Sequence, residues 1–166
     1  MRRAVMTAAV LACVLGLAAC NDDAAGAGSP TTGQRQAGMP YTGNDPCALL
    51  KPADLPELNQ DSQIQPTALN GSTCAGDDFM VQISDGVDGG LGDMQATGPG
   101  AKPIPDVGGY KAALRQTTIP GQTNCGVVLQ VTETQLVQVF VTKSDPKLAC
   151  DTANKAAAIV AGRLPK

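Results

Sequence analysis

Four cysteines beyond residue 45 constrain the fold of this chain more than any other feature: Cys47, Cys74, Cys125 and Cys150. No two of them form a Cys-x-x-Cys pair, the spacing on which many structural zinc sites are built. An even number of widely spaced cysteines is instead typical of a disulfide-braced, exported domain. We therefore expect two disulfides, with a four-thiolate zinc site as the alternative, and neither a resident metal ion nor another cofactor.

The beginning of the chain has the layout of an export signal. Met1, Arg2 and Arg3 form a positive start, and residues 4–19 carry no charge. This apolar run is shorter than the roughly 20 residues that a membrane-spanning helix needs. The run ends in LAAC at residues 17–20, which resembles the bacterial lipobox, the motif at which a cysteine is lipidated and the chain is cut before it.

We therefore predict a lipoprotein signal peptide over residues 1–19 and lipidation of Cys20. Cys13 follows a weaker copy of the motif and falls within the discarded signal. Acyl chains such as palmitate would then hold the protein on the extracytoplasmic face of the cell membrane, since each buried methylene contributes on the order of 0.8 kcal/mol. The alternatives are an ordinary secretory signal with a cysteine near its cut and an uncleaved anchor.

The remaining chain divides by composition into a tether and one domain. Residues 20–44 are rich in Gly, Ala, Ser, Thr and Pro and have no hydrophobic period, so we expect a disordered tether after Cys20. Such a tether has a typical span of roughly 25 to 30 Å. Residues 45–166 have the length of a single ordinary domain.

Two strand patterns and two helix starts define the expected domain. Alternating β-branched residues over 125–142 predict an antiparallel hairpin, and residues 79–83 predict a further strand. A strand over 107–115 is expected after the Gly108-Gly109 turn. Asp45-Pro46 and Asp145-Pro146 both combine a helix N-cap with a proline in the first turn.

The second helix has an apolar stripe at spacings of three and four, formed by Cys150, Ala153, Ala157, Val160 and Leu164. Short helices, antiparallel strands and a closing helix predict an α+β fold, an antiparallel sheet with the N- and C-terminal helices packed on it. Four cysteines permit three connectivities. Because two of them lie near strands and two on the terminal helices, we predict Cys74–Cys125 and Cys47–Cys150.

Composition excludes several classes of function. The chain has no histidine, which excludes Ser-His and Cys-His nucleophiles and histidine metal sites. Its net charge of −3 argues against nucleic acid as a partner. The acidic side chains near the Gly-rich stretch 85–100 lack the spacing of a calcium loop, so we expect a solvated loop there; they are Asp77, Asp78, Asp85, Asp88 and Asp93.

The domain from residue 45 onward resembles a known protein family. The run DPCALLKPADL at residues 45–55, the two middle cysteines and the ending RLP at residues 163–165 resemble a domain of unknown function found in actinobacterial cell-envelope lipoproteins. Members often carry an aromatic residue two positions after the middle cysteine, where this chain has Gly76. The resemblance implies an α+β surface lipoprotein and supplies no catalytic residues.

These observations favour a non-catalytic binding module that engages another protein of the cell envelope. A pair of the aspartates is the minimum that sugar hydrolysis requires, but two Phe, two Tyr and no Trp leave few rings to hold a sugar. We therefore expect no enzymatic activity. The alternative function is a carrier that holds a lipid or small apolar molecule between the sheet and its helices.

Overall fold

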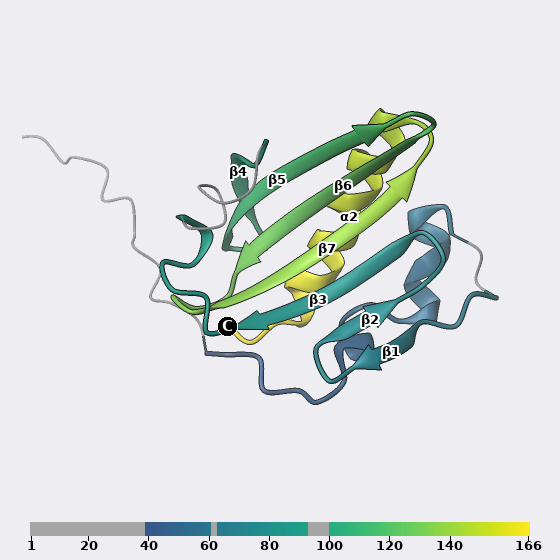
Figure 1. The fold of residues 1–166 in the computed structure, drawn as a ribbon. Coiled ribbons are helices and arrows are strands. Elements are labelled where there is room, and N and C mark those ends of the chain that lie inside the picture. Colours follow the sequence, from purple (N-terminus) through teal and green to yellow (C-terminus); the bar gives the residue numbers. More distant parts are fainter. Residues whose placement is uncertain (1–38, 61–62, 93–99) are drawn as a thin grey trace, which may run out of the picture. The chain divides into compact units, whose positions relative to one another are not determined.

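The computed structural model describes residues 39–60, 63–92 and 100–166, where seven strands form one antiparallel sheet with helices on one face (Figure 1). The α+β fold expected from the sequence is confirmed. The predicted signal peptide 1–19, Cys20 and most of the tether 20–44 lie outside the described residues. The elements are η1 (Pro46–Leu49), η2 (Pro52–Leu58), β1 (Thr67–Asn70), β2 (Thr73–Ala75), β3 (Phe79–Asp85), β4 (Lys102–Val107), β5 (Tyr110–Ile119), β6 (Gln122–Gln130), β7 (Gln135–Lys143) and α2 (Pro146–Arg163).

The strand order is β1-β2-β3-β7-β6-β5-β4, and every neighbouring pair is antiparallel. Two meanders, β1–β3 and β4–β7, therefore meet at the pair β3–β7. In that pair Val81 lies opposite Val139, which also lies opposite Val127 of β6. The last strand in the chain is thus the central strand of the sheet.

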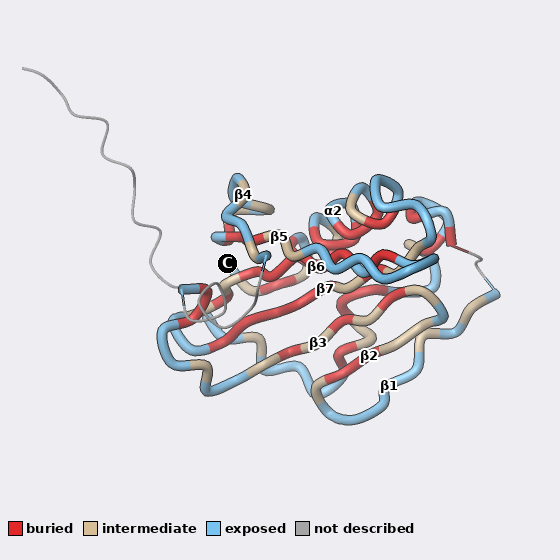
Figure 2. Tube along the Cα trace, turned by 45° about the horizontal axis from the view of Figure 1, so that its top comes forward, coloured by how far each residue is buried: buried red, intermediate tan, exposed pale blue. Residues whose placement is uncertain are grey.

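The alternation in the predicted hairpin follows from the two faces of the sheet. Val137, Val139 and Val141 are fully buried on the face that carries the helices, because successive side chains of a strand point to opposite sides. The hairpin lies where the sequence predicted it, as β6 and β7. Figure 2 shows buried residues concentrated in these central strands and exposed residues in the edge strands β1 and β4.

The β4–β5 turn requires glycine for two reasons. Gly108 and Gly109 have φ values of 59° and 95°, as a tight hairpin turn demands. A Cβ on Gly108 would also lie 2.6 Å from the Cβ of Ala161, so the turn packs directly on α2. Of the strand expected over 107–115, residues 110–115 are confirmed as part of β5, whereas Val107 ends β4, a strand that the sequence did not predict.

Helix α2 begins at Pro146 and is capped, as predicted, by Asp145, whose Oδ1 accepts a hydrogen bond from the backbone N–H of Leu148 at 2.7 Å. The side of the helix that faces the sheet is mostly alanine: Ala149, Ala153, Ala156, Ala157 and Ala161 are fully buried. Such small side chains let the helix lie close against β6 and β7, behind the sheet in Figure 1.

The expected N-terminal helix consists of the two short 3₁₀ segments η1 and η2. Asp45 caps the first through a 2.9 Å bond from the Cys47 N–H. Pro46, Pro52 and Pro56 fix φ and remove backbone donors, which keeps both segments short. Their leucines complete the core beside α2: Leu49, Leu50, Leu55 and Leu58.

The disulfides are Cys47–Cys74 and Cys125–Cys150, so the predicted pairing was wrong. Cys74 lies on β2 and Cys125 on β6, with β3 and β7 between them. Three strand spacings amount to about 14 Å, whereas bridged cysteines have Cα atoms about 4.4 to 6.8 Å apart. Each disulfide instead joins one strand to the helical segment that covers it, with Cα–Cα distances of 5.1 and 5.0 Å.

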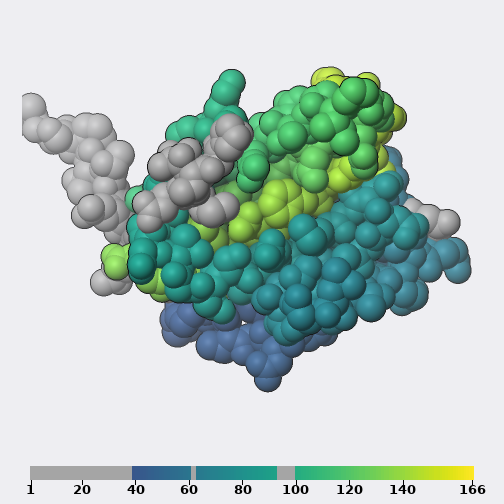
Figure 3. Space-filling model, viewed as in Figure 1, coloured from purple at the N-terminus to yellow at the C-terminus, as the bar shows by residue number. Residues whose placement is uncertain are grey.

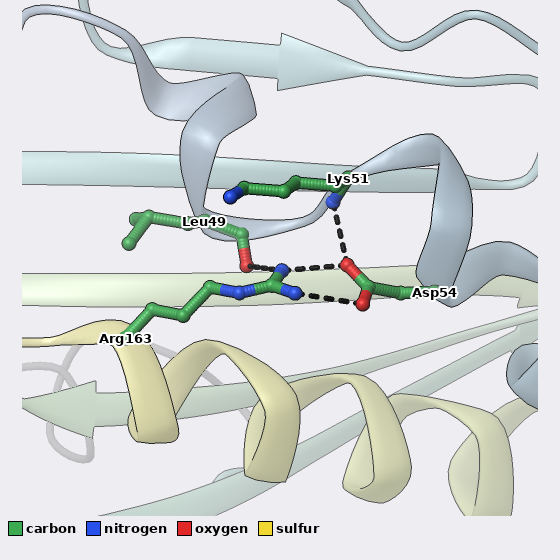
Figure 4. Close-up of polar contacts among 4 residues, drawn as sticks. All are labelled: Leu49, Lys51, Asp54 and Arg163. Carbon is green, nitrogen blue, oxygen red and sulfur yellow. Dashed lines mark hydrogen bonds and ion pairs between the residues drawn. The ribbon is translucent and has the colours of Figure 1, made fainter.

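An arginine at the end of α2 holds the N-terminal segments in place (Figure 4). Arg163 donates two hydrogen bonds to the Asp54 carboxylate, at 2.5 and 2.7 Å, and a third to the carbonyl oxygen of Leu49 at 3.0 Å. The backbone N–H of Lys51 also donates to Asp54, at 2.7 Å. The Arg163 hydrogen bonds hold the pKa of the Asp54 carboxyl below its ordinary value. We call Asp54, Arg163 and the Leu49 carbonyl the terminal clamp.

The first described residues, which precede η1, are held against the start of β7 by hydrogen bonds. The Gln135 side chain accepts a hydrogen bond from the Tyr41 N–H at 2.7 Å and donates one to the Tyr41 carbonyl at 3.0 Å. Its amide nitrogen also donates to Asp85 at 2.7 Å. Tyr41 is therefore fixed by both of its backbone polar groups.

Candidate binding groove on the open sheet face

The face of the sheet opposite α2 is left largely uncovered by the described residues and carries a groove. At one end of this face, Leu91 covers a small apolar cluster with Val128 and Leu136. Beyond that cluster lies a hollow of about 480 Å³. Figure 3 views this face, with β7 recessed between the β5–β6 hairpin and β3. We call this hollow the open-face groove; its lining residues are Met80, Gln82, Arg115, Thr117, Ile119, Gln122, Asn124, Phe140 and Thr142.

One row of residues across four strands forms the floor of the groove. Arg115 lies opposite Gly126, Gly126 opposite Phe140, and Phe140 opposite Met80. A Cβ on Gly126 would lie 2.6 Å from two carbon atoms of the Phe140 ring. The ring therefore occupies the space above β6 that any other residue at position 126 would fill. This glycine makes the floor of the groove both low and apolar.

The walls of the groove carry polar groups with free hydrogen-bonding capacity. Three amides, those of Gln82, Gln122 and Asn124, and two hydroxyls, those of Thr117 and Thr142, line it. Within the described residues, none of these side chains makes a hydrogen bond to another protein group. Amides and hydroxyls both donate and accept, so this lining suits a polar ligand.

Arg115 is the one charged side chain in the described lining of the groove. It is half-buried and makes no ion pair with a described residue, whereas Arg163 and Lys143 are each paired. A guanidinium presents a planar set of donors that matches a carboxylate or phosphate in a bidentate manner. The groove therefore offers one uncompensated positive charge beside an apolar floor.

A second hollow of about 320 Å³ adjoins the first at the β5–β6 turn and shares Gln122 and Thr142 with it. It contains Lys143 and Asp78, which form an ion pair at 2.6 Å. The charge of Lys143 is thus already neutralised. This second hollow lies beside the open-face groove, toward the end of β7.

Among the described residues, those singled out by the sequence do not gather in the open-face groove. The four cysteines beyond residue 45 are all in disulfides, and Cys20 lies outside the described residues. Asp78 and Asp85 have separate partners, Lys143 and Gln135. In the described part of the chain, no three His, Cys, Asp or Glu side chains gather as metal ligands would, and Asp93 lies outside it.

Sequence reasoning missed the groove itself. The pattern of Gln138, Phe140 and Thr142 against the β7 valines was visible, and it correctly indicated two faces. It did not show which face the helices cover, because that depends on the packing of α2. Arg115 stood at the end of a predicted strand with no sequence signal that marked it.

The motifs that carry the family resemblance meet in the terminal clamp. Asp54 comes from the run at 45–55 and Arg163 from the ending at 163–165, and the two side chains form a bidentate pair. A Cβ on Gly76, the position at which the resemblance implies an aromatic residue nearby, would lie 2.3 Å from the ring of Phe79, so a neighbouring ring already fills that space. The resemblance therefore concerns the architecture of the fold rather than the groove.

Comparison with known proteins identifies the family of the chain. No curated protein and no solved structure matches the chain significantly. A family model described as "Protein of unknown function (DUF3558)" matches residues 15–163, which include both halves of the terminal clamp and all four bridged cysteines. The chain belongs to this family of unknown function, DUF3558.

Proposed function

We propose that this protein is a lipid-anchored, extracytoplasmic lipoprotein that binds another cell-envelope protein through the open-face groove. The observation that carries the proposal is the groove itself, a hollow in which unpartnered polar side chains surround an apolar floor. A surface of this composition is stable in water and still offers a partner both hydrogen bonds and apolar contact.

The proposed location rests on the start of the chain and on the cysteines. The charged start, the short apolar run and the lipobox-like LAAC support lipidation of Cys20. The two disulfides support an oxidising compartment. None of the helices in the described residues has the length and apolarity of a membrane span.

A binding role is favoured over a catalytic one by the chemistry of the groove. The sequence has no histidine, and the described lining contains no carboxylate and no cysteine. General acid–base and nucleophilic catalysis most often use such groups, and a threonine hydroxyl needs a base beside it to act as a nucleophile. The amides, hydroxyls and single arginine of the groove instead provide recognition.

The alternative function, a carrier with apolar cargo between sheet and helices, has no observation in its favour. The alanines of α2 lie fully buried against the sheet, and both hollows described above are lined by residues of the sheet and its turns. Most residues that line the groove are polar. A polar protein segment fits this lining better than a lipid chain does.

Site-specific photo-crosslinking in the intact membranes of an exporting host tests the proposal. A photoreactive residue replaces Gln122 in the groove or, as a control, Lys155 on the exposed side of α2. We expect a discrete protein adduct from position 122 that is absent from position 155. Asn124→Lys places a long charged side chain in the groove and should abolish the adduct, while the matched Asn154→Lys on α2 should leave it unchanged.

Two results would contradict a binding role for the groove. The first is an equal yield of the same adduct from positions 122 and 155. The second is an adduct from position 122 that survives Asn124→Lys, since a partner seated in the groove has to contact that position.

A further inference from the structure

We propose that the occupant of the open-face groove is an extended acidic peptide segment, whose carboxylate pairs with Arg115 while a neighbouring apolar side chain packs on Phe140. This inference rests on the proposed function and names the chemistry of the partner. It combines the charge of the groove, the spacing of its polar groups and the shape of its floor.

The charge of the groove selects an anion. Arg115 is half-buried without an ionic partner among the described residues, in a chain whose acidic residues outnumber its basic ones. Two other cations near the open face do not compete: Lys143 is paired with Asp78, and Lys111 is exposed and lies outside the groove. Electrostatic complementarity therefore points to a ligand that brings its own carboxylate.

The spacing of the polar groups selects an extended chain. Arg115 and Thr117 are two residues apart on β5, and Gln122 and Asn124 are two apart on β6. Same-face side chains of a strand recur about every 6.6 Å, which is also the repeat of an extended peptide. A peptide parallel to these strands therefore meets successive groove side chains with every second residue.

The floor selects an apolar side chain near the carboxylate. Phe140 and Met80 lie opposite each other, and Gly126 separates Phe140 from Arg115 in the same row. The single ring lies over Gly126, in the space that a Cβ there would occupy. One ring held in this position serves an aliphatic side chain better than a chain of sugars, whose sites commonly stack each unit on an aromatic platform.

The test measures binding of two probe peptides to the full-length, detergent-solubilised lipoprotein by fluorescence anisotropy. The first is a short fluorescein-labelled peptide of alternating serine and valine with one central glutamate. The second is identical except that glutamine replaces the glutamate. We expect the glutamate peptide to bind about tenfold more tightly, as the loss of one charge-assisted pair predicts.

Three variants assign that preference to Arg115. Arg115→Gln should remove the preference for the glutamate peptide. Arg115→Lys should retain part of that preference, because lysine keeps the charge without the bidentate geometry. Lys111→Gln removes an equal charge from the same face of the same strand, four residues earlier, and should leave the preference intact. An unfolding temperature equal to that of the wild-type protein establishes that each variant is folded.

The outcomes separate this inference from the proposed function. Equal affinity for the two peptides, with both weakened by Asn124→Lys, would overturn the anion preference and keep the groove as a binding surface. No binding of either peptide, together with a position-122 adduct that a glucuronate oligomer displaces, would assign the groove to an acidic glycan. No peptide binding and no groove-dependent adduct would remove both proposals.

Discussion

A single glycine determines the depth of the groove. Gly126→Ala would place a methyl group within 2.6 Å of the Phe140 ring, which then has to rotate out of the groove floor. We expect a loss of about 1–3 kcal/mol in the free energy of unfolding, the usual cost of overpacking, and weaker binding of the glutamate peptide. Urea unfolding and anisotropy measure the two effects.

A glycine-to-alanine substitution on the exposed side of α2 serves as the control for Gly126→Ala. Gly162 lies on the exposed side of α2, and a Cβ added to it would have no described heavy atom within 4 Å outside its own helix turn. Gly162→Ala should therefore stabilise the protein by about 0.5–1 kcal/mol through helix propensity. Stabilisation by Gly126→Ala would show that the Phe140 ring is not confined by that glycine.

The terminal clamp makes stability depend on pH through Asp54. The pKa of this carboxyl is lowered in the folded protein, chiefly by its hydrogen bonds from Arg163. The resulting stabilisation is complete above the unfolded value, about pH 4, and is lost as the pH falls through the lower folded pKa. Asp54→Asn should lower the free energy of unfolding by about 1–3 kcal/mol at neutral pH. It should also remove the part of the pH dependence of stability that comes from Asp54. Urea unfolding at several pH values measures the difference.

An exposed ion pair provides the comparison for the clamp. Lys147 and Asp151 form an i,i+4 pair on α2, with side chains 84% and 52% exposed, whereas those of Arg163 and Asp54 are 29% and 15% exposed. Asp151→Asn should change stability little, since water screens exposed pairs. If Asp54→Asn changes stability as little as Asp151→Asn does, the clamp is not a stabilising feature.

At the scale of elements, each disulfide attaches a helical segment to one strand. The bridges close loops of 27 and 25 residues, and the chain-entropy relation gives about 3.5 kcal/mol for loops of this length. Replacing both cysteines of either pair by serine should lower stability by about that amount. Non-reducing peptide mapping should recover Cys47 linked to Cys74 and Cys125 linked to Cys150. A Cys74–Cys125 peptide would instead require a different strand order.

The elements that could be predicted from the sequence are those with strong local signals. The β6–β7 hairpin has β-branched alternation, and α2 has both a cap and an apolar stripe. Strand β4 was missed because Pro103 and Pro105 suggest a loop; an edge strand tolerates both, since one side of it needs no hydrogen bonds. Strand β1 is exposed along its whole length and so has no alternation to detect.

The disulfide pairing and the groove depended on information that no local pattern contains. Cys74 and Cys125 both lie on strands, but their separation follows from the insertion of β7 next to β3. The importance of Arg115 likewise follows from its place in one row with Gly126 and Phe140, on the side of the sheet away from the helix-facing valines of β7. Both are properties of the order and packing of elements, which only tertiary structure defines.

At the scale of the whole molecule, the proposed anchor gives a direct prediction. Cys20→Ser removes the thiol that the lipid requires, so the protein should move from the membrane fraction to the soluble exported fraction. Cys13→Ser should leave it in the membrane fraction, because the proposal places that cysteine in the discarded signal. Fractionation and immunoblotting of the exporting host measure the distribution. A Cys20→Ser protein that stays membrane-bound would contradict lipidation at this position.

The attachment of Tyr41 to Gln135 has a mechanical consequence. Gln135 begins β7, whereas Phe140 and Thr142 of the groove lie near its end, about 20 Å further along the strand. With the proposed anchor at Cys20 and a partner in the groove, a pull between membrane and partner would act along β7 for as long as the two Tyr41–Gln135 hydrogen bonds hold. The ladder bonds to β3 and β6 run across that direction, so they share the load in shear rather than breaking one after another. Under the proposed anchoring and binding, the central strand would carry the tension between the bilayer and the bound partner.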